Sequence, residues 1–324
     1  MENAPNTSAE GHIAKFDDAE VFSSALKRVD MEVLQTGSGV FRASYASFST
    51  GICDAQVGSI NQPIFARGAS DPKRLGFLVE LRKARGWSWF GESMEDASVG
   101  VCAGGSDLMI KAGSGTQWAF ISAPPESLAQ CAQTVYGREL ALPRRGPVRI
   151  KPHPLEVAVI RGLLVESLTA IKAGSPDLLR VKASIDRALH RMMVQMLLGE
   201  TSEVRRAEIV RVQVVLKRVH YFMAGHLGDA IGLDQMCRAT GVDKETLVRI
   251  FRDCLGLDPV QYLKVCRLNQ VHKALRRADP ATIAVADIAR AWGFSNLRRF
   301  TREFTEWFGQ SPSEVLRQPS RTPY

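Results

Sequence analysis

The chain of 324 residues is long enough for two domains and a connecting segment. Its 42 Lys and Arg residues outnumber the 34 Asp and Glu residues, and the resulting net charge of +8 favours a polyanionic partner. The sequence has no run of about 18 apolar residues, and its polar start lacks the apolar stretch of a signal peptide. We therefore expect a cytoplasmic protein without a membrane span or a membrane partner.

Hydrophobic patterning predicts an antiparallel β domain between residues 20 and 150. Residues 1–19 are expected to form a disordered tail, and 20–29 a short helix. The short apolar runs that follow are separated by turn-forming Gly, Asp-Pro and Ser-Gly, which is typical of a sandwich or barrel. The expected strands cover 40–48, 55–66, 75–82, 87–91, 97–103, 107–111 and 117–122. A helix then starts at Pro124–Pro125 and ends near Tyr136.

Several aromatic side chains lie within the expected strands. Alternation along a strand places Trp87 and Trp89 on one face. Such rings either form the core of the domain, which is the commoner role for any one of them, or enclose an aromatic or ammonium ligand through stacking and cation–π contacts. The candidate effector-binding residues are Phe65, Trp87, Trp89 and Trp118.

Motifs that would carry catalysis or hold a metal are absent from the sequence. Only His12 and His153 precede residue 190, so the clustered histidines of a metal-dependent enzyme are missing. No nucleophile elbow, phosphate loop or dinucleotide fingerprint is present. The six cysteines form no Cys-x-x-Cys pair and are expected to be small core residues. We expect no enzyme activity, no catalytic residue, no metal and no cofactor.

A Pro-, Gly- and Arg-rich stretch at 137–154 predicts a domain boundary. Two helices with apolar stripes follow at 155–172 and 177–198. Two such helices suit an antiparallel hairpin, whose stripes pack either into the core of the same chain or against a second copy. The segment 151–200 is therefore expected to be a helical linker that also forms a homodimer.

The most informative feature is a repeat near the C-terminus. Residues 236–262 and 288–315 carry nearly the same pattern: a short helix, a turn glycine, a capped second helix and a Gly-x-x-Pro stop. This order is typical of a helix-turn-helix unit. At an offset of 53 residues, Leu247 corresponds to Phe300, Arg249 to Arg302, Phe251 to Phe304, Gly256 to Gly309 and Pro259 to Pro312.

Helical spacing separates an inner and an outer face in each second helix. Asp243 and Ser295 are expected to cap these helices. The residues expected to face the core are Leu247, Ile250, Phe251, Cys254, Phe300, Phe304, Trp307 and Phe308. The outward residues, and thus the candidate DNA contacts, are Lys244, Glu245, Val248, Arg249, Arg252, Leu297, Arg298, Thr301, Arg302 and Thr305.

Outward arginines suit both requirements of DNA binding. A guanidinium group can bridge guanine O6 and N7, worth roughly 1–3 kcal/mol of discrimination, or it can bind a phosphate. A single exposed Arg is more often a solvent-exposed surface residue without a DNA contact. Arg249 and Arg302, however, occupy matched positions in matched motifs. Residues 1–203 are neutral overall, whereas 204–324 contain 20 basic and 12 acidic residues and carry the whole excess charge. The positive charge thus coincides with the repeat.

A long amphipathic helix is expected between the two units, from Pro259 to Ala278. A helix of about 20 residues is about 30 Å long, close to the roughly 34 Å of one turn of B-DNA. Such a helix can hold two recognition helices in successive major grooves.

This arrangement resembles the AraC/XylS family of bacterial transcription regulators. In the first unit, the resemblance is carried by Leu247, Arg249, Phe251, Gly256, Pro259, Tyr262, Arg267 and Leu268. In the second unit, it is carried by Asp287, Ile288, Ala289, Gly293, Phe294, Phe300, Arg302, Phe304, Gly309 and Pro312. The match covers about residues 204–317, and the DNA-binding domain is expected over 204–320.

The resemblance implies a transcription regulator, usually an activator that works with RNA polymerase. It implies that 20–150 is a cupin-like sensor domain for a small-molecule effector, and that the chain forms a dimer. The aromatic side chains of the expected strands favour an amine or an aromatic compound as this effector. In arrangement the chain is similar to the subgroup that includes the activator of the ethanolamine-utilisation operon. The expected fold class is therefore α+β, with a β sensor domain, a helical linker and an all-α domain with two helix-turn-helix motifs.

Two alternatives remain open at this point. One is a cupin-like enzyme domain tethered to DNA, against which the scarcity of His counts. The other is a regulator without an effector, whose N-terminal half only dimerises.

Overall fold

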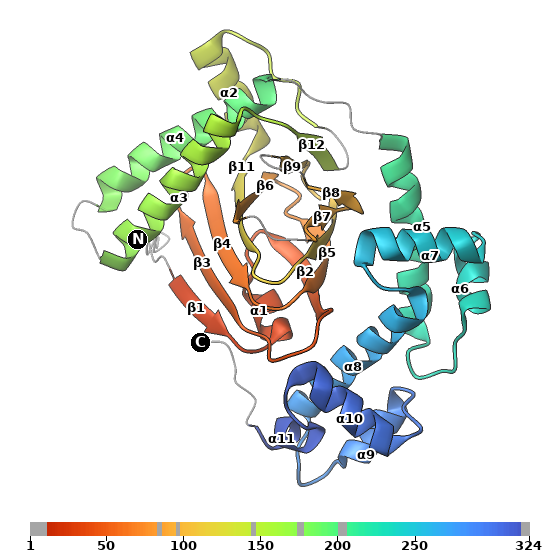
Figure 1. Ribbon diagram of the computed structural model, residues 1–324. Helices are drawn as coiled ribbons and strands as arrows, with labels where there is room; N and C mark the ends of the chain where they lie inside the picture. Colours follow the sequence, from red (N-terminus) through yellow and green to blue (C-terminus); the bar gives the residue numbers. More distant parts are fainter. Residues whose placement is uncertain are drawn as a thin grey trace, which may run out of the picture.

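The computed structural model describes residues 12–82, 86–94, 98–143, 147–173, 178–199 and 206–318. A β domain with helices packed on one side occupies the first part of the chain, and a purely helical domain occupies the last part (Figure 1). The expected α+β class is confirmed: an antiparallel β region precedes an all-α region.

The β domain contains two antiparallel sheets. In spatial order, the seven-stranded sheet comprises β1 (His12–Phe16), β3 (Ala43–Ser49), β4 (Asp54–Ile60), β11 (Gln117–Ala123), β6 (Leu75–Arg82), β9 (Val99–Cys102) and β12 (Pro147–Ile150). The five-stranded sheet comprises β2 (Val29–Gln35), β5 (Ile64–Ser70), β10 (Asp107–Ala112), β7 (Ser88–Trp89) and β8 (Glu92–Ser93). The narrower expectation of a cupin-like barrel stays a prediction.

Four helices belong to the β domain. They are α1 (Ala19–Ala25), α2 (Pro125–Tyr136), α3 (Pro154–Ala173) and α4 (Leu178–Leu198). The apolar stripes of the last two helices are buried in one core with Phe77, Val101 and Ile121 of the seven-stranded sheet. The stripe residues in that core include Val157, Ile160, Leu164, Ile185, Leu189 and Met193.

A buried carboxylate ties α4 to the sheet. Asp186 accepts hydrogen bonds from the backbone N–H groups of Ile52 at 3.0 Å and Cys53 at 2.9 Å, and from the Thr50 hydroxyl at 2.6 Å. Of the two roles open for the stripes, the structure therefore assigns them to the core of the same chain, and the helices expected as a separate linker pack as part of the β domain.

Several strand boundaries differ from the expectation. The single strand expected over 55–66 is two strands that belong to different sheets, β4 to the seven-stranded and β5 to the five-stranded sheet, and Asn61 and Pro63 lie in the turn between them. The expected helix over 20–29 starts one residue earlier and ends at Ala25, and β2 begins at Val29. The Pro-rich stretch expected as a boundary contains the edge strand β12, whose Pro147 is tolerated at a strand start.

Part of the segment expected as a tail over 1–19 forms regular structure. Residues 12–16 form β1, which pairs with β3, and Asp18 caps α1 by accepting from the N–H groups of Glu20 and Val21. Residues 1–11 lie outside the described part of the chain.

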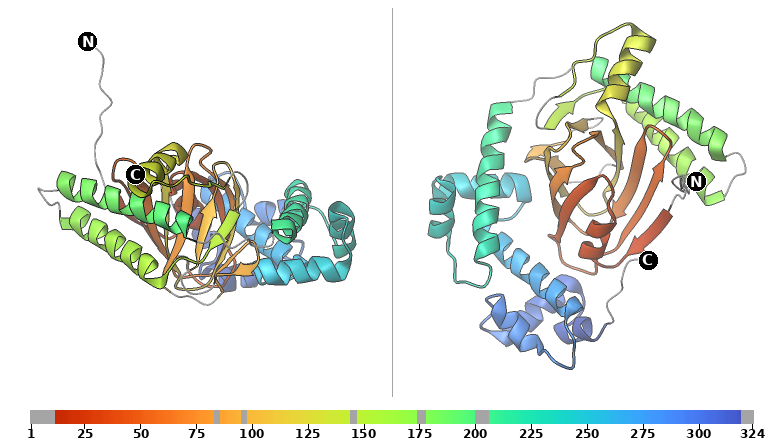
Figure 2. Two further views of the ribbon diagram at one scale, coloured as in Figure 1. Left: turned by 90° about the horizontal axis from the view of Figure 1, so that it is seen from above. Right: turned by 180° about the vertical axis from the view of Figure 1, so that it is seen from behind.

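The helical domain packs against the five-stranded sheet, on the opposite side of the β domain from α3 and α4 (Figures 1 and 2). Its helices are α5 (Arg206–Gly225), α6 (Leu233–Thr240), α7 (Lys244–Leu255), α8 (Pro259–Arg277), α9 (Val285–Ala291), α10 (Leu297–Phe308) and α11 (Pro312–Arg317). One continuous apolar core includes residues of both domains.

Aromatic rings form the centre of this interdomain contact. Phe65 of β5 stacks on His220 of α5, with ring centroids 5.9 Å apart, and lies edge-on to Tyr262 of α8 at 6.0 Å. The imidazole of His220 is hydrogen-bonded to the Tyr262 hydroxyl. Burial lowers the pKa of His220 to about 3, so the ring is neutral and suits an apolar interface.

Hydrogen bonds to backbone groups extend the interdomain interface to the second half of the helical domain. The Asn269 side chain of α8 donates to the Gln35 carbonyl at 3.2 Å, and its amide oxygen accepts from the Gln35 N–H at 3.3 Å. The Gly39 N–H donates to the carbonyl of Trp307 at the end of α10, at 2.8 Å. The β domain therefore contacts both halves of the helical domain.

Candidate nucleic-acid interface

The two expected helix-turn-helix units are present. Helices α6 and α7 form the first unit, α9 and α10 form the second, and α8 joins them (Figure 1). The second helix of each unit has 12 residues, and the two helices are displaced by 53 residues in sequence. This confirms the repeat as a structural repeat.

The turn and the ends of α7 follow the sequence prediction. Gly241 adopts the left-handed conformation that ends α6, and Gly256 does the same at the end of α7. The Asp243 carboxylate accepts from the Thr246 N–H at 2.8 Å and so caps α7, as expected. Pro259 then starts α8, where a missing N–H costs nothing.

The N-cap of α10 lies one residue later than the sequence predicts. Asn296, and not Ser295, is the N-cap, since the Asn296 side chain accepts from the Arg299 N–H at 3.0 Å. Both residue types are good caps, so composition alone does not choose between neighbours. The end of α10 is as expected, with Gly309 in the left-handed conformation.

The inner faces of both recognition helices are buried. In α7, Leu247, Phe251 and Cys254 lie in the core, and Ile250 is half-buried. In α10, the buried residues are Phe300, Phe304 and Phe308, and Trp307 is half-buried. Successive centroids along these three phenylalanines are 5.5 and 4.6 Å apart. The predicted core of each unit is confirmed.

The ten predicted DNA contacts occupy equivalent places on the two outer faces. In order, Lys244, Glu245, Val248, Arg249 and Arg252 of α7 correspond to Leu297, Arg298, Thr301, Arg302 and Thr305 of α10. Eight of these side chains are exposed. Val248 and Leu297 are half-buried, and Leu297 packs partly against the core of the second unit. We call the ten residues the reading face.

The reading face offers several kinds of contact. The Thr301 and Thr305 hydroxyls donate to the carbonyls four residues earlier, at 2.9 and 2.8 Å, which leaves their lone pairs and methyl groups outward. The Arg302 guanidinium lies 3.9 Å from the Glu306 carboxylate, and both side chains are about 70% exposed. Such a long and solvent-exposed ion pair restrains the guanidinium only weakly. Lys244 is paired with Asp234 of α6 at 2.7 Å.

The β domain touches the first recognition helix at its C-terminal end. Gly91, in the turn between β7 and β8, lies so close to α7 that an added Cβ would be 2.4 Å from the Cys254 sulfur. This close approach explains why glycine stands there. The residues of the reading face lie in the first nine positions of α7, away from this contact.

The linking helix has the predicted extent. With 19 residues, α8 is about 28 Å long. It begins in the first unit, where Tyr262 contacts Phe251, and ends in the second, where Leu275 joins the core. Two helix-turn-helix units with matched outer faces on α7 and α10, joined by the single helix α8, define a tandem helix-turn-helix DNA-binding domain.

The four candidate effector-binding residues all lie in, or pack against, the apolar core that both domains share. Phe65 belongs to the interdomain contact described above. Trp87 and Trp89 are buried, and no hydrogen-bond partner is present for either indole N–H within the described residues. Trp118 is half-buried and lies over Gly58. Their role in effector binding stays a prediction.

Within the ranges that the structure describes, no three His, Cys, Asp or Glu side chains are grouped in a way that could hold a metal ion. No helix within those ranges combines the length and apolarity of a membrane span. Burial raises the pKa of the Cys102 and Cys254 thiols to about 12, so both are unreactive core residues.

Comparison with known proteins supports the same class. Residues 236–318 match a family described as a helix-turn-helix domain. The probable thc operon regulatory protein of Rhodococcus erythropolis is 33% identical over 159 residues, which cover 48% of this chain and 47% of that protein. The right origin-binding protein of Escherichia coli K12 is 31% identical over 106 residues, covering 32% of this chain and 35% of that protein.

Among solved structures, the AraC-like transcriptional activator CuxR is similar over 87% of this chain and 100% of its own, with 13% identity and a TM-score of 0.42. The chain spans about half of the first relative and about a third of the second.

The chain therefore carries, at residues 236–318, a helix-turn-helix domain, and the part of the chain that it shares with the R. erythropolis protein relates it to an operon regulator. The family resemblance inferred from the repeat is thereby confirmed. The narrower likeness to the ethanolamine-utilisation activator stays a prediction.

Proposed function

We propose that this protein is a sequence-specific DNA-binding transcription regulator that acts in the cytoplasm, where it reads two successive major-groove segments. The observation that carries the proposal is the matched pair of exposed faces on α7 and α10, held by one helix of about 28 Å. B-DNA repeats every 34–36 Å or so, so both faces can meet the same side of a duplex. The positive charge of this third of the chain supports the same partner.

The test is DNA binding by the full chain. A duplex enriched from a random library should bind at least about 10³-fold more tightly than random duplex. Its affinity should fall by about 10³-fold or more between about 50 and 200 mM salt, as for a protein with six or more phosphate contacts. Equal affinity for the enriched and random duplexes at every salt concentration would contradict the proposal.

We further propose that the β domain senses a small-molecule effector and passes the signal to the helical domain. The continuous core between the domains supports this, because a ligand that favours one interdomain arrangement changes the other domain's freedom. As an activator, the protein would also contact RNA polymerase. A regulator without an effector is the second candidate, and it would be favoured if no ligand altered DNA binding.

We also propose that the protein is a homodimer that pairs through α3. One face of this helix packs into the β domain, but the other carries apolar residues in contact with solvent. Leu155 is 68% exposed, Val159 49% and Val165 60%, and they lie on one side of the helix together with Gly162. Exposed apolar residues gathered on one face mark an association surface.

Val159→Glu is expected to shift the protein from dimer to monomer, because a carboxylate would have to be buried between the helices. Sedimentation velocity of the full chain measures this directly. Val135→Glu on α2 is a matched control, since Val135 is exposed to nearly the same extent, 46%. If both variants sediment like the unaltered protein, α3 is not the dimer interface.

A further inference from the structure

The two helix-turn-helix units are in contact beside the helix that joins them. The segment that leads from α5 into the first unit passes close to the end of α9, since a Cβ added to Gly228 would lie 2.7 Å from the carbonyl oxygen of Ala291. A Cβ added to Gly293, in the turn of the second unit, would in turn lie 3.2 Å from the Gly228 carbonyl oxygen. Glycine at these positions lets the two backbone segments approach each other more closely than larger residues would.

Arg267 of α8 lies at this contact. Its Nε donates to the Leu227 carbonyl at 2.7 Å, and its Nη2 donates to the Asp229 carbonyl. The guanidinium carbon is also close to the second unit, because it would lie 3.2 Å from a Cβ at Gly293. One half-buried side chain therefore contacts both the segment before the first unit and the turn of the second unit.

Trp292 joins the apolar cores on the two sides of this contact. It is half-buried and packs against the core that the first unit shares with the β domain, of which Leu227 is a buried member. It also packs against the core of the second unit, which contains Phe300 and Phe304. A large aromatic side chain that is buried against two bodies stabilises one arrangement of them. The end of α9 is therefore held to the first unit by apolar packing as well as by Arg267.

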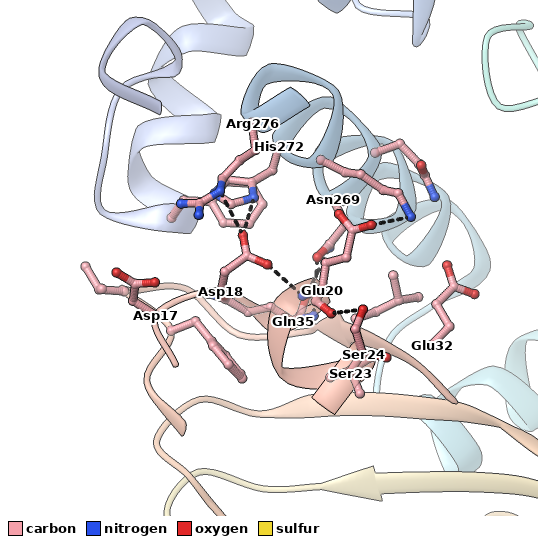
Figure 3. Close-up of a pocket in the computed structure, with 18 of the residues that line it drawn as sticks. Asp17, Asp18, Glu20, Ser23, Ser24, Glu32, Gln35, Asn269, His272 and Arg276 are labelled. Carbon is pink, nitrogen blue, oxygen red and sulfur yellow. Dashed lines mark hydrogen bonds and ion pairs between the residues drawn. The ribbon is translucent and has the colours of Figure 1, made fainter. Parts of the chain in front are cut away.

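The β domain holds the second unit at other elements. Figure 3 shows the Asp18 carboxylate beside α8, where it lies 3.6 Å from His272 Nδ1 and 3.5 Å from Arg276 Nε. The hydrogen bond from Gly39 described above is made to the end of α10. These contacts involve α8 and α10, whereas Trp292 directly follows α9. The contact between the units thus constrains a different side of the second unit.

We propose that Trp292 and Arg267 are positioning residues that fix the spacing at which the two reading-face helices meet DNA. This inference rests on the proposed function, in which α7 and α10 each read one segment, or subsite, of the same duplex. One base pair added between the subsites moves one of them by about 3.4 Å and turns it by about 35° around the duplex. Two units in direct contact cannot follow this displacement without losing the contact. Units joined by α8 alone have more freedom to adjust, so they discriminate less between spacings.

The experiment measures the affinity of the full chain for the enriched duplex and for the same duplex with one base pair inserted or deleted between the subsites. The unaltered chain should bind each changed spacing more weakly by about tenfold or more, because one reading face loses its register with the bases. In Trp292→Leu and Arg267→Met this ratio should fall to about threefold or less, while the preference for bases within each subsite is retained. Trp292→Phe should keep more of the ratio than Trp292→Leu, since a ring is retained.

Trp307→Leu and Arg218→Met are the matched controls. Trp307 packs against the core of the second unit, and Arg218 of α5 donates to the Thr240 carbonyl of α6 at 3.2 Å. Each control removes the same kind of group as its counterpart at 292 or 267, but from a contact that does not join the two units. Both controls should therefore keep the spacing ratio of the unaltered chain, even where they lower stability.

The proposal is overturned if Trp292→Leu and Arg267→Met keep the spacing ratio of the unaltered chain, or if the two controls lose it to the same extent. It is also overturned if the unaltered chain binds all three spacings alike. In each of these cases, a retained preference for the enriched over the random duplex leaves the proposed function intact. Loss of that preference in the unaltered chain contradicts the proposed function itself.

Discussion

Phe304→Ala is expected to destabilise the second helix-turn-helix unit by about 3–5 kcal/mol, the usual cost of removing a buried Phe side chain. Phe304 is fully buried and contacts the rings of Phe300, Phe308 and His272, with centroids 5.5, 4.6 and 6.0 Å apart. A unit with such a small core has few other contacts to compensate for the loss. Hydrogen exchange of the full chain should therefore show faster exchange in peptides from α9, α10 and α11.

Two variants serve as controls for this result. Phe304→Leu keeps most of the apolar volume and should retain more of the protection. Thr305→Ala changes the adjacent, exposed position and should leave exchange nearly unaltered. Since His272 also stacks on Phe308, loss of the unit should extend to the contact with Asp18. If Phe304→Ala left protection of α9–α11 unchanged, Phe304 would not support the core.

The DNA-binding domain could be predicted in detail because its determinants are local. Capping residues, turn glycines and apolar positions at helical spacing all lie within one unit of about 25 residues, and the second copy repeats them. The error in the α10 cap concerns two adjacent residues of similar capping ability. Ten reading-face residues could be named, and eight of them are exposed.

The strands and the interdomain contact depend on partners far away in the sequence. Gln35 and Asn269 are 234 residues apart, and no periodicity links them. The short edge strands β1 and β12 have little pattern of their own and are defined by their pairing with β3 and β9. Asp18 falls within the expected tail, so neither its cap on α1 nor its contact with α8 was predicted from the sequence.

Phe65 shows how a correct observation can lead to an incomplete interpretation. From the sequence, an aromatic residue in a strand of a sensor domain can belong to the core or to a ligand site. Both interpretations place its contacts within that one domain. In the structure the ring packs against His220 and Tyr262 of the helical domain. A buried aromatic side chain of a strand can thus also pack between domains. Composition and spacing do not distinguish this role from a role in the core of one domain or in a ligand site.

Arg249→Ala and Arg302→Ala should each reduce affinity for the enriched duplex by about 5- to 150-fold, which corresponds to the roughly 1–3 kcal/mol of a bidentate arginine–guanine contact. Both residues are the sixth of their 12-residue helix, both are exposed, and neither is needed by a core. Fluorescence anisotropy with the enriched duplex and with duplexes altered at single positions measures the effect. A contact with a base should relax specificity at one position, and the two arginines should affect positions about one helical turn apart.

Arg42→Ala is the matched control, since it removes the same charge from an exposed site on the β domain. It should change affinity far less than either reading-face variant and should leave the specificity unaltered. An arginine that binds only phosphate would behave differently from both: its loss would weaken binding to all duplexes alike and lower the salt dependence by about one ion. Because α8 holds α7 and α10 apart, the two arginines act independently. The variant with both Arg249→Ala and Arg302→Ala should therefore lose close to the sum of the binding free energies lost by the two single variants. If neither single variant altered affinity or specificity, the outer faces of α7 and α10 would not be the surface that reads DNA.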